Sequence, residues 1–236
     1  MTLIALDKLG ASSNKLEQIF NNGIDQLVLI QPITNIPEAF DFVASLGDST
    51  KYTTYLAYFH RKLTTETAEA VVKDALPYLI PGLSASAFHA MIRLAYAIEI
   101  QNIDEVAIAL AYWSAEYQAF ELNQQQTNNT LAEVLRSVAD KGVHFEFAPG
   151  IIVDRMNEIG ELLKSDQSLV QPESISLEEV RRLALTAFFA EDDFTLLHTV
   201  TGCYAFSKIL PFINDKEWAI RELCQAIVID SIRTGL

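Results

Sequence analysis

The chain has 236 residues, half of them hydrophobic, with nine glycines and seven prolines, so it can bury a core and is not expected to be disordered. Its 17 basic and 31 acidic residues give a formal net charge of -14. Such a surface repels nucleic-acid phosphates and anionic lipid, which argues against a nucleic-acid-binding or membrane-surface protein.

The N-terminus and the cysteines indicate a cytoplasmic location. The first residues lack the basic segment of a secretory signal, and no stretch reaches the roughly 18 uncharged apolar residues of a membrane span. Cys203 and Cys224 lie outside any CxxC pair, in apolar helical patterns. We therefore expect two buried thiols in a reducing compartment.

Helical periodicity dominates the first part of the chain. Leu3, Leu6 and Leu9 recur one turn apart before Gly10, and Pro37 suits the first turn of a helix that would end at Gly47. The predicted helices here cover residues 2–9, 14–23 after a serine cap, 36–47, 51–63, and a segment from Thr64 or Thr65 to the prolines at 77 and 81.

Capping signals define the helices that follow. A serine is expected to cap a long helix over 84–101, and Asn102 with Glu105 has the spacing of a capping box, with the next helix running to about Leu122. Ser176 with Glu179 repeats that spacing. Later helices are predicted over 130–141, 152–164, 176–190, 192–210 and 215–233.

Strand signals are few. The apolar segment 26–33 contains Pro32, and residues 143–147 alternate over only five positions, so both are expected to be connectors or at most one minor pair. The sequence has no long linker and no repeat period. We therefore predict an all-α protein of about ten helices, with residues 1–236 forming a single domain.

His198 is the histidine with the strongest local pattern. On its helix face lie Phe194, Thr201, Gly202 and Ala205, so small residues leave space beside the imidazole. Either another helix packs closely against Gly202, or a ligand or metal occupies that space. The residues themselves leave both interpretations open.

His89 shares a predicted helix face with Arg93 and Tyr96. A buried Arg93 needs an anionic partner, which Glu99, Glu105 or Glu116 would supply in an internal salt bridge. Alternatively, these side chains line a polar pocket for an oxygenated or anionic substrate. The helix predicted over 84–101 and the next one also carry aromatic residues, which would belong to the core or to the walls of such a pocket. These residues are Tyr96, Tyr112, Trp113 and Tyr117.

The other two histidines carry weaker signals. His60 lies near a helix end, where it suits the C-terminal dipole, and His144 has no spacing pattern. The acidic residues 191–193 are expected in a first helical turn. The sequence contains no HExxH, CxxC, GxGxxG, GxxxxGK[ST] or GxSxG motif, so no local signature indicates zinc, nucleotide or serine-hydrolase chemistry.

Three segments together resemble the questin oxidase-like family. They are "ALDKLGASSNKLEQIF" (5–20), "PGLSASAFHAMIRLAYAIEIQNIDEVAIALAYW" (81–113) and "DDFTLLHTVTGCYAF" (192–206). The resemblance covers most of the chain, with residues 123–175 matching poorly. Within it, His89 and His198 fall on the family's histidine motifs, whereas His60 and His144 fall on none.

The resemblance implies an α-helical oxidoreductase linked to oxidative, Baeyer–Villiger-like opening of aromatic quinone rings. It also implies non-haem Fe(II) held by several histidines, with a modified lysine in some members. His89 and His198 would then be metal ligands, and we expect Arg93 and Tyr96 to orient an oxygen of the substrate or of O₂. Other family ligands would fall outside residues 1–236. They are a histidine just before the "LGAS" helix, and a His and a Lys in the family's C-terminal segment.

Two hypotheses of different classes follow. In the first, the protein is an oxygenase-like enzyme acting on a small aromatic or quinone-like molecule. In the second, it is a shortened, non-catalytic relative that binds a hydrophobic ligand or a protein partner. Carboxylates, water or the second subunit of a homodimer would have to complete a metal site built from two imidazoles.

Overall fold

A computed structural model describes residues 1–27, 31, 33, 36–122, 125–143, 146–166, 171–191 and 194–233. Within these residues the protein is all-α, as predicted, with one two-residue parallel strand pair, β1 (Gln126–Thr127) and β2 (Gln171–Pro172). The α-helices are α1 (Thr2–Lys8), α2 (Ser13–Gly23), α3 (Tyr52–Leu63), α4 (Ala68–Leu79), α5 (His89–Glu99), α6 (Ile103–Ala115), α7 (Leu131–Val143), α8 (Ile152–Asp166), α9 (Leu177–Glu191), α10 (Phe194–Ile209) and α11 (Lys216–Arg233).

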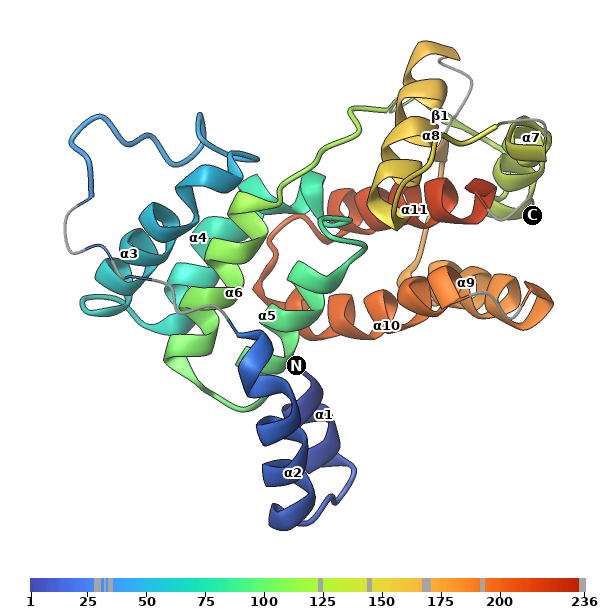
Figure 1. Cartoon of the computed structure of the whole chain (residues 1–236). Helices are drawn as coiled ribbons and strands as arrows, with labels where there is room; N and C mark the ends of the chain where they lie inside the picture. Colours follow the sequence, from blue (N-terminus) through green and yellow to red (C-terminus); the bar gives the residue numbers. More distant parts are fainter. Residues whose placement is uncertain are drawn as a thin grey trace.

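Helices α5 and α10 lie at the centre of the molecule (Figure 1). Helix α5 packs against α6 on one side and α10 on the other, and α6 in turn packs against α3. Helix α11 contacts α7, α8, α9 and α10, whereas the α1–α2 pair projects away from the remaining helices (Figure 1). The α5–α10 contact thus joins the helices of the first and second parts of the chain.

Local capping signals placed several helix starts correctly. The Asn102 side chain accepts from the Glu105 amide at 2.9 Å, and Ser12 caps α2. Ser176 and Glu179 form a reciprocal capping box, in which the carboxylate accepts from the Ser176 amide at 2.9 Å. Helix α4, however, begins after a Thr67 cap, and α6 ends at Ala115 rather than near Leu122.

The predicted helix over 36–47 is wrong, because these residues form turns. Phe40 and Phe42 are two positions apart, a spacing that places side chains on opposite faces of a helix. In the structure both rings contact Tyr55 and Tyr58 of α3, which only a non-helical backbone allows. Tertiary aromatic packing therefore overrides the local helical pattern.

The predicted start of the 84–101 helix is also wrong, because α5 begins at His89. Ser86, Ala87 and Phe88 instead have left-handed φ angles of 50°, 53° and 66°. Non-glycine residues rarely adopt this conformation, and three in succession are held only where the surroundings determine them.

The core lies under α4, α5, α6, α10 and α11 and includes fully buried Trp113, Phe88 and Phe206. Cys203 and Cys224 are both free and buried, as predicted. The strand candidates at 26–33 and 143–147 and the acidic run 191–193 fall partly outside the described residues.

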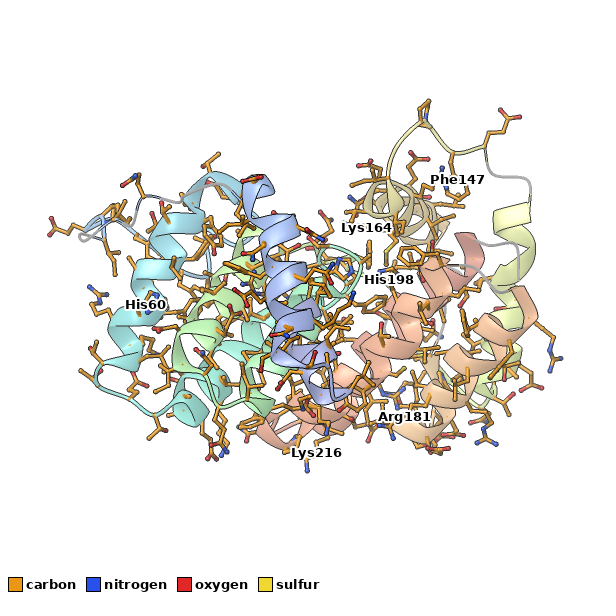
Figure 2. All side chains as sticks on the ribbon, turned by 60° about the horizontal axis from the view of Figure 1, so that its bottom comes forward. His60, Phe147, Lys164, Arg181, His198 and Lys216 are labelled. Carbon is orange, nitrogen blue, oxygen red and sulfur yellow. The ribbon has the colours of Figure 1, made fainter. Side chains whose placement is uncertain are left out.

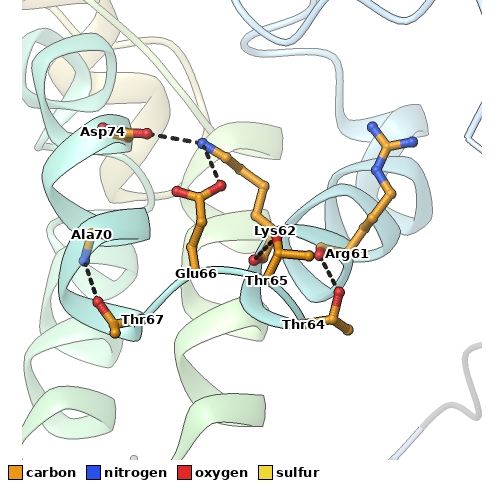
Figure 3. A network of polar contacts seen from close by, with 8 residues as sticks. All are labelled: Arg61, Lys62, Thr64, Thr65, Glu66, Thr67, Ala70 and Asp74. Atoms are coloured by element: carbon orange, nitrogen blue, oxygen red, sulfur yellow. Dashed lines mark hydrogen bonds and ion pairs between the residues drawn. The ribbon is translucent and has the colours of Figure 1, made fainter.

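A polar network joins the end of α3 to α4 (Figure 3). The Lys62 ammonium lies 3.0 Å from the Asp74 carboxylate and 3.6 Å from that of Glu66, while the Thr67 hydroxyl accepts from the Ala70 amide. Among the described helices, none combines the length and apolar character needed to cross a bilayer.

Candidate active site

His89 and His198 meet at the packed interface of α5 and α10. Their Nε2 atoms are 3.0 Å apart, although the residues are 109 positions apart in the chain. The ring centroids are 4.8 Å apart, with the planes inclined at 63°. The two motif histidines of the sequence analysis are therefore neighbours in space.

A main-chain carbonyl orients the His198 ring. Its Nδ1 atom lies 2.9 Å from the Phe194 carbonyl oxygen, and the Phe194 ring packs edge-on against the imidazole with centroids 4.8 Å apart. A carbonyl only accepts, so Nδ1 carries the proton and Nε2 of the neutral ring presents a lone pair. This is the arrangement in which histidine usually ligates a metal.

His89 is the first residue of α5 and is half-buried. Burial, and secondly the neighbouring His198, lower the pKa of its imidazole below the ordinary value. The neutral ring donates a hydrogen bond to His198 or presents a lone pair of its own, according to its tautomer.

The left-handed turn before His89 is held in place from two sides. The Ser86 hydroxyl donates to the Glu116 carboxylate at 3.1 Å, and the Phe88 ring packs against Gly202 of α10. A Cβ atom at Gly202 would lie 3.1 Å from this ring. Of the two interpretations of the space beside His198, close packing therefore explains Gly202, with Phe88 as the neighbour.

The histidine pair lines a pocket of about 620 Å³ between α5, α10 and the start of α8. Its walls combine apolar side chains with a few polar groups, as small-molecule sites do. The lining residues are Ser86, Ala87, His89, Tyr112, Glu116, residues 150–155, Phe194 and His198.

Arg93 and Tyr96 lie farther along α5. The Arg93 guanidinium binds the Glu105 carboxylate of α6 through two contacts, at 3.1 and 3.2 Å. Within the described part of the chain, neither Arg93 nor Tyr96 lines the histidine pocket. The internal salt bridge considered from the sequence is therefore present, and the orienting role of these two residues stays a prediction.

The remaining histidines lie elsewhere. His60 is partly exposed on α3, away from His198 (Figure 2), with Nδ1 3.8 Å from an Asp104 carboxylate oxygen. His144 falls outside the described residues. Among the candidate aromatic walls, Tyr112 lines the pocket, whereas Trp113 is fully buried and donates to the Gly82 carbonyl at 2.8 Å.

Sequence reasoning missed the contribution of α8. Gly150, Asp154 and Arg155 line the pocket from a stretch that matched the family pattern poorly. The Asp154 carboxylate accepts from the Ile151 amide at 2.8 Å at the start of this helix. Asp154 and Arg155 follow a short apolar run and belong to no motif, so the local sequence does not indicate that they line a pocket.

The histidine pair fits two adjacent ligands of one metal ion. Two nitrogen atoms at about 2.1 Å from a metal and about 90° apart are separated by about 3.0 Å. Among the side chains that the structure describes, no group of three or more His, Cys, Asp or Glu has a metal-binding arrangement. A metal held by this pair would therefore have two ligands among the described residues and would need further ones.

Fold and site together define an all-α protein with a histidine-lined pocket at a helix–helix interface. The questin oxidase-like family model matches residues 1–230, which contain both histidines and helices α1 to α10. The chain belongs to the questin oxidase-like family.

One relative is the Baeyer-Villiger oxidase AgnL3 of Paecilomyces divaricatus, which is 24% identical over 184 residues. The aligned region covers 72% of this chain and 37% of the relative, so the chain spans less than half of that protein's length. No solved structure matches the chain.

Proposed function

We propose that the pocket between α5, α8 and α10 is the active site of an oxygenase-type oxidoreductase. The observation that carries the proposal is the 3.0 Å approach of His89 and His198 in the wall of the 620 Å³ pocket. The name of the relative, a Baeyer-Villiger oxidase, supports oxidation with oxygen insertion or ring opening as the reaction class.

The lining suits an aromatic or quinone-like small molecule. The exposed Phe194 ring, Tyr112 and the apolar residues 151–153 offer contacts for a planar ring. Burial of aromatic surface supplies most of the affinity in such a pocket, and a few polar groups fix the orientation.

We propose Fe(II) as the cofactor, with His89 and His198 as two of its ligands. When bound, iron supplies the binding and activation of O₂. The Phe194 carbonyl engages Nδ1 of His198 and leaves its Nε2 as the atom that would bind a metal, and the α5–α10 packing holds the two Nε2 atoms 3.0 Å apart. The remaining ligands would be carboxylates, water, or groups beyond the described residues.

Metal content tests this proposal. Protein purified without a chelating column and loaded anaerobically with Fe(II) is expected to hold near-stoichiometric iron, and His198→Ala is expected to lose it. His60→Ala, which removes a partly exposed histidine of α3 outside the pocket, is the matched control and should keep the metal. Iron that survives His198→Ala, with the variant folded by circular dichroism, would contradict the assignment.

A non-catalytic ligand-binding role is the second candidate. The observation in its favour is that the described residues supply only two metal ligands. In that case the loaded protein holds no iron, and mass spectrometry of the denatured protein detects a copurified hydrophobic molecule. Oxygen consumption with a hydroxyanthraquinone, abolished in His89→Ala, would instead favour the enzyme.

A further inference from the structure

Arg155 is a half-buried arginine whose guanidinium differs in its contacts from those of Arg93 and Arg221. It lines the histidine pocket from the first turn of α8, and its Nε atom is buried without a hydrogen-bond partner. Within the described part of the chain, no carboxylate forms an ion pair with its guanidinium. The guanidinium carbon lies 6.0 Å from the centroid of the Phe147 ring, in a cation–π contact.

Two other arginines show how this protein satisfies a partly buried guanidinium. Arg93 binds Glu105 through two nitrogen atoms. Arg221 donates to the Glu217 carboxylate at 2.6 Å and to two backbone carbonyls. A partly buried guanidinium without such partners is energetically unfavourable, so Arg155 retains donors for a group that the described residues do not supply.

The two carboxylates of the pocket are engaged elsewhere. Asp154 accepts from the Ile151 amide at 2.8 Å, and Glu116 accepts from the Ser86 hydroxyl at 3.1 Å. Their charges disfavour an anion near them, whereas the Arg155 guanidinium attracts one. Among the described lining residues, Arg155 is therefore the one lysine or arginine, and it lies in a pocket with aromatic and apolar walls.

We propose that Arg155 binds an anionic oxygen attached to the aromatic ring of the substrate, a carboxylate or a phenolate. The planar guanidinium provides parallel donors for such an oxygen pair while the Phe147 ring covers one of its faces. This inference rests on the proposed function, because it assigns the substrate class of the same pocket: aromatic acids or ionised phenols rather than neutral aromatics.

A matched pair of ligands tests the charge preference. Anthraquinone-2-carboxylate and anthraquinone-2-carboxamide have nearly the same shape and differ in charge. In calorimetric titrations the wild-type protein is expected to bind the carboxylate about 10- to 100-fold more tightly than the amide, the range for hydrogen bonds to charged groups. If phenolate is the natural group, the affinity for 2-hydroxyanthraquinone rises as its hydroxyl ionises.

Variants assign that preference to Arg155. Arg155→Met is expected to bring the carboxylate-to-amide ratio close to one, and Arg155→Lys, which keeps the charge but loses the planar fork, to give an intermediate ratio. Arg61→Met removes the same charge from the exposed surface of α3, where the side chain points away from the Lys62 network (Figure 3), and should leave the ratio unchanged.

The outcomes separate this inference from the proposed function. Equal affinities for the two ligands in the wild-type protein, with both weakened by His198→Ala, would overturn the role of Arg155 and leave the pocket intact. A preference that persists in Arg155→Met would also overturn it. Failure of all three ligands to bind would overturn both the inference and the aromatic substrate class. The metal content tests the iron site separately, because that measurement uses no aromatic ligand.

Discussion

Glu99 is the residue at which three helices are tied together. Its carboxylate on α5 lies 2.6 Å from Lys8 of α1 and 2.9 Å from Lys208 of α10, and it accepts from the Tyr204 hydroxyl at 2.8 Å. Burial opposes its ionisation, but hydrogen bonds from Lys208, Lys8 and Tyr204 outweigh that effect and lower the pKa to about 2.

Replacing this carboxylate should destabilise the protein in a pH-dependent way. Glu99→Gln is expected to lower the free energy of unfolding at pH 7 by about 1 kcal/mol. A depressed pKa contributes stability above the unfolded value near 4.5, and this contribution is lost as the pH falls towards 2. Urea unfolding of wild type and variant at several pH values should therefore show a difference that shrinks below pH 4.5; a constant difference would contradict this account.

Gly202 is the residue that allows α10 to approach the turn before His89. Gly202→Ala is expected to cost about 1 kcal/mol or more, because the new methyl group meets the fully buried Phe88 ring at 3.1–3.2 Å. Gly23→Ala at the end of α2 meets no atom within 4 Å and should be neutral or stabilising. Thermal unfolding compares the two, and equal effects would show that Phe88 does not restrict the site.

The connection between α5 and α6 has the hydrogen bonds of a Schellman motif. The Gln101 amide donates to the Ile98 carbonyl at 3.1 Å, and the Asn102 amide donates to the Ala97 carbonyl at 3.2 Å. Gln101 has a φ of 54° at the position where glycine is usual. The end of α5 thus keeps its capping hydrogen bonds, while the backbone of Gln101 adopts a strained left-handed conformation.

Glycine at this position should stabilise the protein. Gln101→Gly is expected to raise the free energy of unfolding by about 0.5–1 kcal/mol, because glycine at this exposed position adopts the left-handed conformation without the steric strain caused by a Cβ atom. Gln101→Ala is the control, since alanine keeps the Cβ atom that causes the strain. Equal stability of the two variants in denaturant titrations would contradict this explanation.

The helix starts that the sequence predicted correctly are those marked by local capping motifs. The caps at Ser12, Asn102 and Ser176 act over three residues, so their spacing suffices to predict them. The helix predicted over 36–47 failed because Phe40 and Phe42 pack on α3, a contact that no local pattern encodes.

The two buried thiols can serve as probes of the global unfolding of the protein. Cys203 of α10 and Cys224 of α11 are buried, and burial raises the pKa of each to about 12. Both thiols are therefore protonated at neutral pH, and reagents that attack the thiolate cannot reach them in the folded protein.

Thiol labelling should follow global unfolding. At pH 8 a disulfide reagent is expected to react with neither cysteine in the native protein and with both in urea, with a midpoint matching that of circular dichroism. Cys224→Ser should reduce the number of reactive thiols from two to one. Rapid labelling of either thiol without denaturant would show that α10 or α11 opens locally.

The sequence by itself determined the helical class, most helix bounds after residue 50 and the buried thiols, because periodicity and capping act between residues close in the chain. The two motif histidines were indicated by the resemblance to the questin oxidase-like family. The tertiary structure alone decided that His89 and His198 meet across 109 positions, that Arg93 pairs with Glu105, and that Arg155 reaches the same pocket from α8. These features depend on how helices pack, and packing joins residues whose separation along the chain carries no local signal.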